Sequence, residues 1–94
     1  MRIDIDELEI WYMDGGGIPT FKYQNFPFTG TAIQYYDNGS ILDETDYVDG
    51  YQEGWVRSFH ENGQLYIEQK KYNNITIDGT YKEFDQDGIL ILEL

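Results

Sequence analysis

The chain has 94 residues, a length that fits one domain with a small hydrophobic core, because such a chain buries only about 60 to 65% of its unfolded surface. Its 18 acidic and 6 basic side chains give a formal net charge of -12, which opposes binding to nucleic acid and to anionic membranes and favours a partner with a basic surface. Cysteine is absent, which excludes a disulfide framework and a thiolate metal site.

Neither a signal peptide nor a membrane span is expected. The first ten residues, MRIDIDELEI, carry carboxylates where a secretory signal peptide has an unbroken apolar stretch. The longest apolar run, Ile89 to Leu92, is far shorter than the roughly 20 residues that span a bilayer. We therefore expect a soluble, cytoplasmic protein.

Alternating apolar and polar residues between turn signals predict β-strands along the whole chain, and no helical periodicity competes with them. Pro19 and Pro27 fall near strand starts or connections, where a missing amide donor costs least. In chain order, the predicted strands are Ile3–Trp11, Ile18–Tyr23, Thr31–Tyr36, Ser40–Tyr47, Trp55–His60, Gln64–Tyr72, Thr80–Phe84 and Ile89–Leu94.

Three of the predicted connections contain an Asn-Gly or Asp-Gly pair, at Asn38-Gly39, Asn62-Gly63 and Asp87-Gly88. Such pairs favour type I′ turns, which need positive φ at both central residues, so each pair predicts a β-hairpin. The pairs recur at intervals of 24 and 25 residues, and a fixed interval of this length indicates stacked supersecondary units. A fainter copy upstream places Asp14-Gly15 where Asn38-Gly39 stands.

The recurring segments YYDNGSI, FHENGQL and FDQDGIL, each followed by a glutamate, and the linker YVDGYQEG resemble the MORN-repeat variant found in bacterial proteins. The resemblance covers residues 30–94 well and residues 1–29 poorly. It implies an all-β fold, in which successive antiparallel hairpins form a meander and a twisted single sheet. We expect a single domain over residues 1–94, with a degenerate first repeat in 1–29 and three repeats in 30–94.

The resemblance also implies a function. Many bacterial single-domain proteins with this repeat look like antitoxin or immunity proteins encoded beside a toxin, whereas eukaryotic MORN arrays are tied to membrane lipids or to scaffolding. The net charge of -12 opposes the lipid alternative.

Two groups of acidic residues are candidates for contacting a basic partner. Glu44, Glu68 and Glu93 occupy the same repeat position, about 10 Å apart on every second strand of a meander. That spacing is too wide for two of them to share a metal ion. Carboxylates and tyrosines also gather between Asp43 and Glu53. Both groups suit an interface, and both also suit a solvated surface. The candidate partner-binding residues are Glu44, Asp46, Tyr47, Asp49, Tyr51, Glu53, Tyr66 and Glu68.

No catalytic residue, cofactor or metal site is predicted, so we do not expect an enzyme. The single histidine, His60, has no oriented partner in the sequence and occupies a repeat position that varies. Residues 83–93 approach an EF-hand loop but begin with glutamate, and Glu93 comes one residue early.

The predicted core is a stripe along one sheet face. The opposite face carries a second apolar set, so either the sheet curls over itself or another protein covers the remainder. The core stripe consists of Tyr35, Ile41, Trp55, Phe59, Leu65, Phe84 and Leu90, and the second set of Tyr36, Leu42, Tyr66, Tyr81 and Ile91.

These features favour an immunity or antitoxin protein that neutralises a cognate, basic toxin domain of nuclease type through an acidic, aromatic-rich surface. The alternative is a structural scaffold or self-associating interaction module that forms a homodimer through the edge strand ILILEL.

Overall fold

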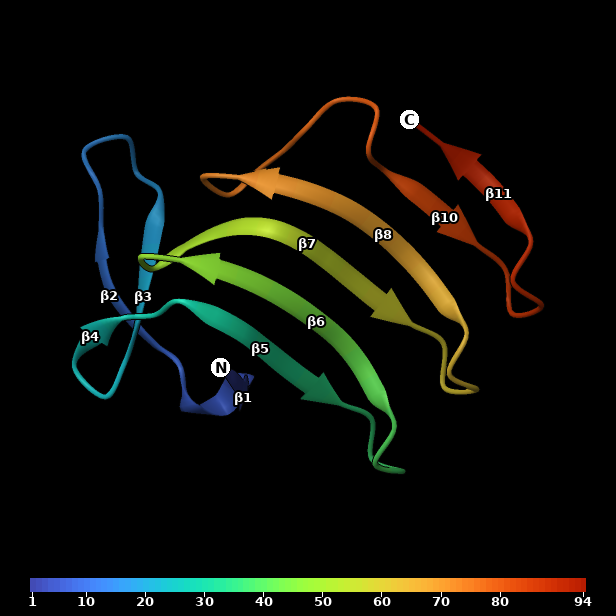
Figure 1. The fold of residues 1–94 in the computed structure, drawn as a ribbon, viewed down its shortest axis with the longest axis horizontal. Coiled ribbons are helices and arrows are strands. Elements are labelled where there is room, and N and C mark those ends of the chain that lie inside the picture. The colour runs from blue at the N-terminus through green and yellow to red at the C-terminus, as the bar shows by residue number, and fades with distance from the viewer.

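A computed structural model describes residues 1–94 and has two β-sheets and one short 3-10 helix (Figure 1). The larger sheet has the strand order β1-β5-β6-β7-β8-β10-β11, with β9 paired to β8, and the smaller sheet has the order β2-β3-β4. The elements are β1 (Arg2–Asp4), η1 (Ile5–Glu7), β2 (Glu9–Met13), β3 (Pro19–Tyr23), β4 (Phe26–Pro27), β5 (Gly30–Tyr35), β6 (Ile41–Val48), β7 (Tyr51–Phe59), β8 (Leu65–Tyr72), β9 (Ile75–Thr76), β10 (Lys82–Phe84) and β11 (Leu90–Glu93).

The predicted all-β repeat fold is confirmed. Strands β5, β6, β7, β8, β10 and β11 form an antiparallel meander, with the short β9 paired to β8 outside this path. Figure 1 shows the twist and curvature of this sheet. The molecule measures 40 × 32 × 19 Å, and it is thin because most of the larger sheet has no second layer against it. No helix has the length and apolar character needed to cross a membrane.

The prediction of one strand over Ile3–Trp11 is wrong. Strand β1 pairs in parallel with β5, so the larger sheet is mixed. The chain then turns through η1, where the Asp4 side chain accepts a hydrogen bond from the Asp6 amide, and β2 continues into the smaller sheet. Local alternation could not reveal this break, because the short segments on either side of η1 both have extended backbone.

The three hairpins are confirmed, but the predicted type I′ turns are wrong. Among the residues of the first turn only Gly39 has positive φ, +88°, and Asn38 does not. The Gly39 amide donates to the Tyr36 carbonyl and the Tyr36 amide donates to the Ser40 carbonyl, so the turn has five residues. In each hairpin the strand that follows the turn has one extra residue, which shifts the register of the pairing. This pattern matches a type I turn closed by a glycine in a β-bulge. The equivalent turns are His60–Gln64 and Asp85–Ile89.

Two-residue turns with positive φ at both positions occur at the opposite ends of the strands. They connect β3 to β4, β6 to β7 and β8 to β9, and consist of Gln24-Asn25, Asp49-Gly50 and Asn73-Asn74. Asparagine tolerates this conformation better than most residues, but only one of these pairs contains glycine, which is why the sequence signal was weak here.

A five-residue turn with the same backbone hydrogen bonds joins β2 to β3. The Gly17 amide donates to the Asp14 carbonyl and the Asp14 amide donates to the Ile18 carbonyl. Gly17, with a φ of +80°, therefore stands where Gly39 stands, two residues beyond the aligned Gly15. Hydrogen bonds from the Ile18 and Gly16 amides to the Asp14 carboxylate lower its pKa.

The predicted core stripe is wrong, because the buried core lies where the smaller sheet covers one end of the larger one. Its four apolar members are Ile3, Phe28, Ala32 and Tyr47, with Phe21 packed against them. The Tyr47 ring centroid is 5.4 Å from that of Phe21 and 5.7 Å from that of Phe28. The stripe residues Tyr35, Ile41, Trp55, Phe59, Leu65, Phe84 and Leu90 are all half-buried or exposed.

The buried Gly50 allows the two sheets to approach. Its amide donates to the Phe28 carbonyl, and its carbonyl accepts from the Phe21 amide. A Cβ atom at this position would lie 2.8 Å from the Phe21 carbonyl oxygen, and φ is +89°. The contact therefore requires glycine for space as well as for conformation.

We expect Gly50→Ala to lower the free energy of unfolding by about 3 kcal/mol, since overpacking adds to the left-handed backbone penalty of about 1 kcal/mol. Gly39→Ala is the matched control, with a φ of +88° and open space around its Cβ position, so it should lose only the backbone penalty. Urea unfolding measures both. Equal losses would contradict the tight approach of the sheets at Gly50.

Candidate interaction surface

A row of alternating charges crosses the larger sheet. The cross-strand partners are Glu44 on β6, Arg57 on β7, Glu68 on β8, Lys82 on β10 and Glu93 on β11. Directly paired residues have their side chains on the same face. The Arg57 Nε donates to the Glu68 carboxylate at 2.8 Å, and the Glu44 carboxylate forms an ion pair with the Arg2 guanidinium. We call these five residues the charge row.

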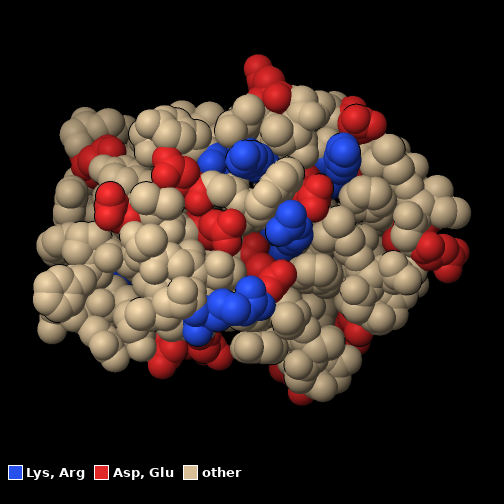
Figure 2. All heavy atoms as spheres, viewed as in Figure 1, with Lys and Arg blue, Asp and Glu red and all other residues tan.

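Trp55 extends this charged face. The Arg57 guanidinium lies 4.7 Å from its ring centroid, and the Lys70 ammonium lies 5.6 Å away. Figure 2 shows Lys and Arg gathered over the middle of one molecular face, with Asp and Glu between and around them. The cations on this face therefore lie among carboxylates.

Two predicted partner-binding residues, Glu44 and Glu68, thus have intramolecular partners. Their role toward another protein stays a prediction, but each carboxylate must compete with an internal ion pair. The signal that sequence reasoning missed was the pair of cations, Arg57 and Lys82, on the intervening strands. Only the register places them in the same row.

Asp46 also has internal contacts. Its carboxylate accepts hydrogen bonds from the Thr31 hydroxyl at 2.8 Å and from the Trp55 amide at 3.0 Å. A Cβ atom on Gly54 would lie within 3 Å of this side chain. Asp46 therefore has a structural role where the strands bulge.

The prediction that Tyr47 offers contact area is wrong, because it is 3% exposed and packs in the core. Alternation along β6 turns its ring toward the smaller sheet, away from the face of Glu44. Burial raises the pKa of its hydroxyl.

Asp49, Tyr51 and Glu53 lie together at the β6–β7 connection. Asp49 is exposed and Glu53 is half-buried. The Tyr51 hydroxyl donates to the Asp14 carboxylate at 3.1 Å, and its pKa is raised by desolvation and by this carboxylate. These three residues are at the opposite end of β7 from Tyr66, so the predicted residues do not form one surface.

The three five-residue turns form an edge at the other end of the sheet, which we call the turn edge (Figure 1). It comprises residues 36–40, 60–64 and 85–89 and contains no Lys or Arg. Three of its carboxylates, on Asp37, Glu61 and Asp87, are exposed. The hydrogen bonds and ion pairs of the structure involve none of them.

Successive turns are joined by side-chain hydrogen bonds at equivalent repeat positions. The Tyr36 hydroxyl donates to the Phe59 carbonyl, and His60 Nε2 lies 2.9 Å from the Phe84 carbonyl oxygen. Since a carbonyl only accepts, Nε2 of His60 is the protonated nitrogen in this contact. His60 therefore links two repeats, a role that its variable position in the sequence did not reveal.

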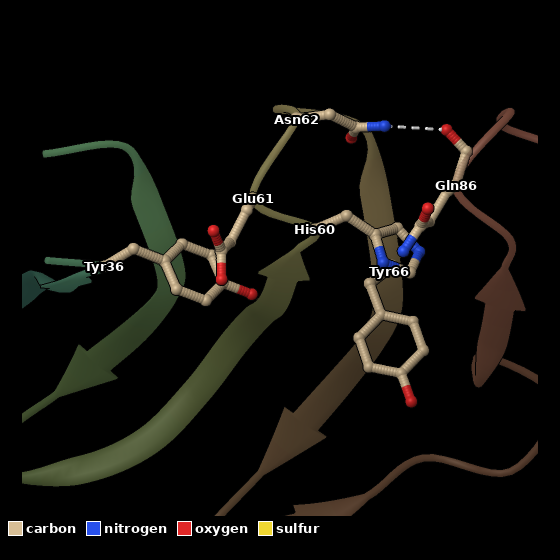
Figure 3. Close-up of a pocket in the computed structure, with 6 residues that line it drawn as sticks. All are labelled: Tyr36, His60, Glu61, Asn62, Tyr66 and Gln86. Atoms are coloured by element: carbon tan, nitrogen blue, oxygen red, sulfur yellow. Dashed lines mark hydrogen bonds between the residues drawn. The ribbon is translucent and has the colours of Figure 1, made fainter. Parts of the chain in front are cut away.

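A groove of about 560 Å³ lies between the turns and is lined by Tyr36, His60, Glu61, Asn62, Tyr66 and Gln86 (Figure 3). In this view Tyr36 and Glu61 are on one side and Tyr66 and His60 on the other. The Tyr66 and His60 ring centroids are 4.5 Å apart, and the Asn62 side chain donates to the Gln86 carbonyl at 2.9 Å. Of the predicted partner-binding residues, only Tyr66 lines this groove.

No group of three or more His, Cys, Asp or Glu side chains is placed to hold a metal ion. The acidic residues of the turn edge are spread over separate turns instead of converging. The chemistry available at this end of the sheet is contact with cationic and hydrogen-bonding groups.

The sequence model of the MORN repeat variant matches residues 28–49, 52–74 and 77–94. The chain belongs to this family. MORN repeats are in general motifs for interaction with proteins or membranes. In this chain the matched MORN segments contain strands β5, β6, β8, β10 and β11, all of β7 but its first residue, the charge row and the turn edge. No curated protein and no solved structure matches the chain.

Reversing the charge of Arg57, the second member of the row, should destabilise the protein. We expect Arg57→Glu to lower the free energy of unfolding by about 1 to 2 kcal/mol, because it places a carboxylate between Glu44 and Glu68 and cross-strand pairs contribute about 0.2 to 1 kcal/mol each. Lys71→Glu changes the net charge equally outside the row and should cost less. Adding Glu68→Arg to Arg57→Glu should recover part of the loss in urea unfolding, and an additive double variant would contradict the pairing.

The Asp43 carboxylate allows a second test of the structure of this sheet. Its Oδ1 is buried without a hydrogen-bond partner, and desolvation raises its pKa above the ordinary value of 3.8. A raised folded-state pKa means that the native state binds the proton more tightly, so stability falls as the pH rises from 3.8 through the raised value.

We therefore expect Asp43→Asn to raise the thermal unfolding midpoint at about pH 7, with a difference that shrinks as the pH falls toward 3.8. Asp78→Asn makes the same change at an exposed position and should leave the midpoint unchanged. Thermal scans across this pH range measure both. A lower midpoint for Asp43→Asn near neutral pH would contradict a desolvated, unpaired carboxylate.

Proposed function

We propose that this MORN-repeat chain is a non-enzymatic, cytoplasmic protein-binding module of the immunity or antitoxin type, which neutralises a cognate toxin domain with a basic surface. The observation that carries the proposal is the distribution of charge. On one face Arg2 and Arg57 form ion pairs with carboxylates, Lys70 lies over Trp55, and Lys82 stands opposite Glu68 and Glu93 in the strand register. The turn edge, by contrast, has carboxylates and no cation.

A basic toxin domain would be attracted over some distance before contact. Complementary charge raises association rates to about 10⁸ per molar per second at low salt. A nuclease-type toxin needs a positive surface to hold its polyphosphate substrate. An acidic protein that covers this surface competes directly with the substrate.

The Tyr36 ring of the turn edge and the Tyr66 ring on β8, which line the same groove, add the second element of an interface. Tyrosine buries a large area at a low cost in side-chain entropy, and aromatic anchors slow dissociation. The turn edge and its groove thus combine carboxylates that steer a partner with rings that hold it.

The direct test is co-purification with the product of the adjacent open reading frame. We expect a complex that weakens strongly between about 50 and about 500 mM salt, because exposed charges are screened over that range. A complex with a flat salt profile would contradict the electrostatic mechanism, and the absence of any complex would contradict the immunity function.

Charge-reversal variants locate the contact. Asp37→Lys, Glu61→Lys and Asp87→Lys together should weaken the complex at least about tenfold. The matched control reverses three exposed acids elsewhere, Asp6, Glu7 and Asp78.

A third variant, Asp49→Lys with Glu53→Lys, tests the predicted residues at the opposite end of the strands. If only this pair weakens the complex, the function stands but the partner binds the β6–β7 end instead of the turn edge.

Strand β11 favours a second candidate, a self-associating scaffold module. It is an edge strand of the larger sheet, and Leu90, Ile91 and Leu92 are 44%, 58% and 42% exposed. Edge strands with apolar side chains are templates for pairing with another chain. Size measurement on the purified protein separates the candidates, because a scaffold forms a homodimer without a partner, whereas repulsion between two acidic chains favours the monomer.

A further inference from the structure

We propose that the groove between Tyr36 and Tyr66 binds a single arginine side chain of the partner protein. This inference rests on the proposed protein-binding function and names the chemical group that the groove recognises. It depends on three features of the groove: an unpaired carboxylate, aromatic rings, and the absence of an internal cation.

The carboxylate belongs to Glu61. It is exposed and takes part in no hydrogen bond or ion pair of the structure, and no Lys or Arg lines the groove. Glu44 and Glu68, by contrast, are both occupied by arginines of this chain. Glu61 thus lacks an internal cation that a ligand would have to displace.

The aromatic rings define which cation fits. Figure 3 shows Tyr36 and Glu61 on one side of the groove and Tyr66 next to His60 on the other. The Tyr36 hydroxyl is fixed by its hydrogen bond to the Phe59 carbonyl. The Tyr66 ring packs at a tilt against His60, with ring centroids 4.5 Å apart, so both rings are held before a ligand arrives. A planar guanidinium stacks on such rings and offers a fork of donors to a carboxylate.

The remaining groups at the rim suit a donor-rich ligand. The Asn62 amide is engaged with the Gln86 carbonyl, and this bond fixes the third turn beside the second. The Gln86 side chain and the Tyr66 hydroxyl have no partner among the side-chain hydrogen bonds of the protein. They can accept from a guanidinium that already contacts Glu61.

On the charged face of the same sheet, an arginine of this chain already contacts a ring and a carboxylate together. There the Arg57 guanidinium lies 4.7 Å from the Trp55 ring centroid while its Nε donates to the Glu68 carboxylate. The groove presents rings and a carboxylate without the arginine. A partner would supply it.

The probe is N-acetyl-arginine-N-methylamide, titrated into the ¹⁵N-labelled full chain by NMR. Its isostere with citrulline in place of arginine has the same shape and no charge. We expect the arginine probe to shift the amides of residues 60–66 and 86 saturably at about millimolar concentration, and the citrulline probe to bind at least about fivefold more weakly. Equal shifts from both probes, or none from either, would overturn the assignment.

Two variants tie the binding to the groove. Glu61→Gln keeps the shape of an exposed turn residue and should weaken the arginine probe at least about fivefold. Tyr66→Leu removes one ring and should also weaken it. Glu93→Gln, at the edge strand, is the matched control and should have no effect.

If Glu61→Gln binds the arginine probe as tightly as the unaltered protein, the site is elsewhere. This titration needs no toxin. Probe binding without a co-purifying partner would contradict the immunity function and leave the groove assignment intact. A partner complex without probe binding would contradict the groove assignment and leave the immunity function intact.

Discussion

The cross-strand register of the hairpins is the constraint on which the rest of this structure depends. Each five-residue turn is closed by one glycine with positive φ and is followed by a bulge, and this combination fixes which residues face each other on the next strand. Because the side-chain period of a strand is two, a slip of one residue would exchange the two faces of the sheet. The charge row, the Trp55 contacts and the groove beside Tyr66 all require this one register.

A sheet with little covering it must satisfy its side chains within a single layer. At one end the smaller sheet supplies a second layer, and the core around Tyr47 forms there because Gly50 lets the backbones approach. Over the rest of the larger sheet, cross-strand pairs and side chains resting on neighbouring strands replace a core. Such a structure leaves much of its surface free for contact, which is consistent with the general use of MORN repeats as interaction motifs.

The repeat, the hairpins and most strand positions could be predicted from the sequence, since glycine-containing turns and alternation are local signals. Three predictions failed for nonlocal reasons. The strand over Ile3–Trp11 is broken because β1 finds a parallel partner, β5, in a distant segment. The turn type was assigned from the Asn-Gly pair, whereas the bulged strand allows the asparagine to keep negative φ. The core was placed on the repeat's aromatic positions, whereas the Phe21 ring comes from outside the matched repeats and the Phe28 ring from the first residue of the first one.

The residues of the candidate site also divide into features that the sequence predicted and features that only the structure revealed. Composition alone determined that the chain is acidic, and the recurring sequence pattern determined that successive segments are copies of one hairpin. The sequence pattern identified Glu44 and Glu68 as repeated positions. Only the tertiary structure decided that these carboxylates face Arg2 and Arg57, that Tyr47 is buried, and that the unpaired Glu61 lines the same groove as Tyr36. The physical reason is that local sequence sets the backbone of each hairpin, whereas pairing between charges depends on the neighbouring strands that assembly places beside them.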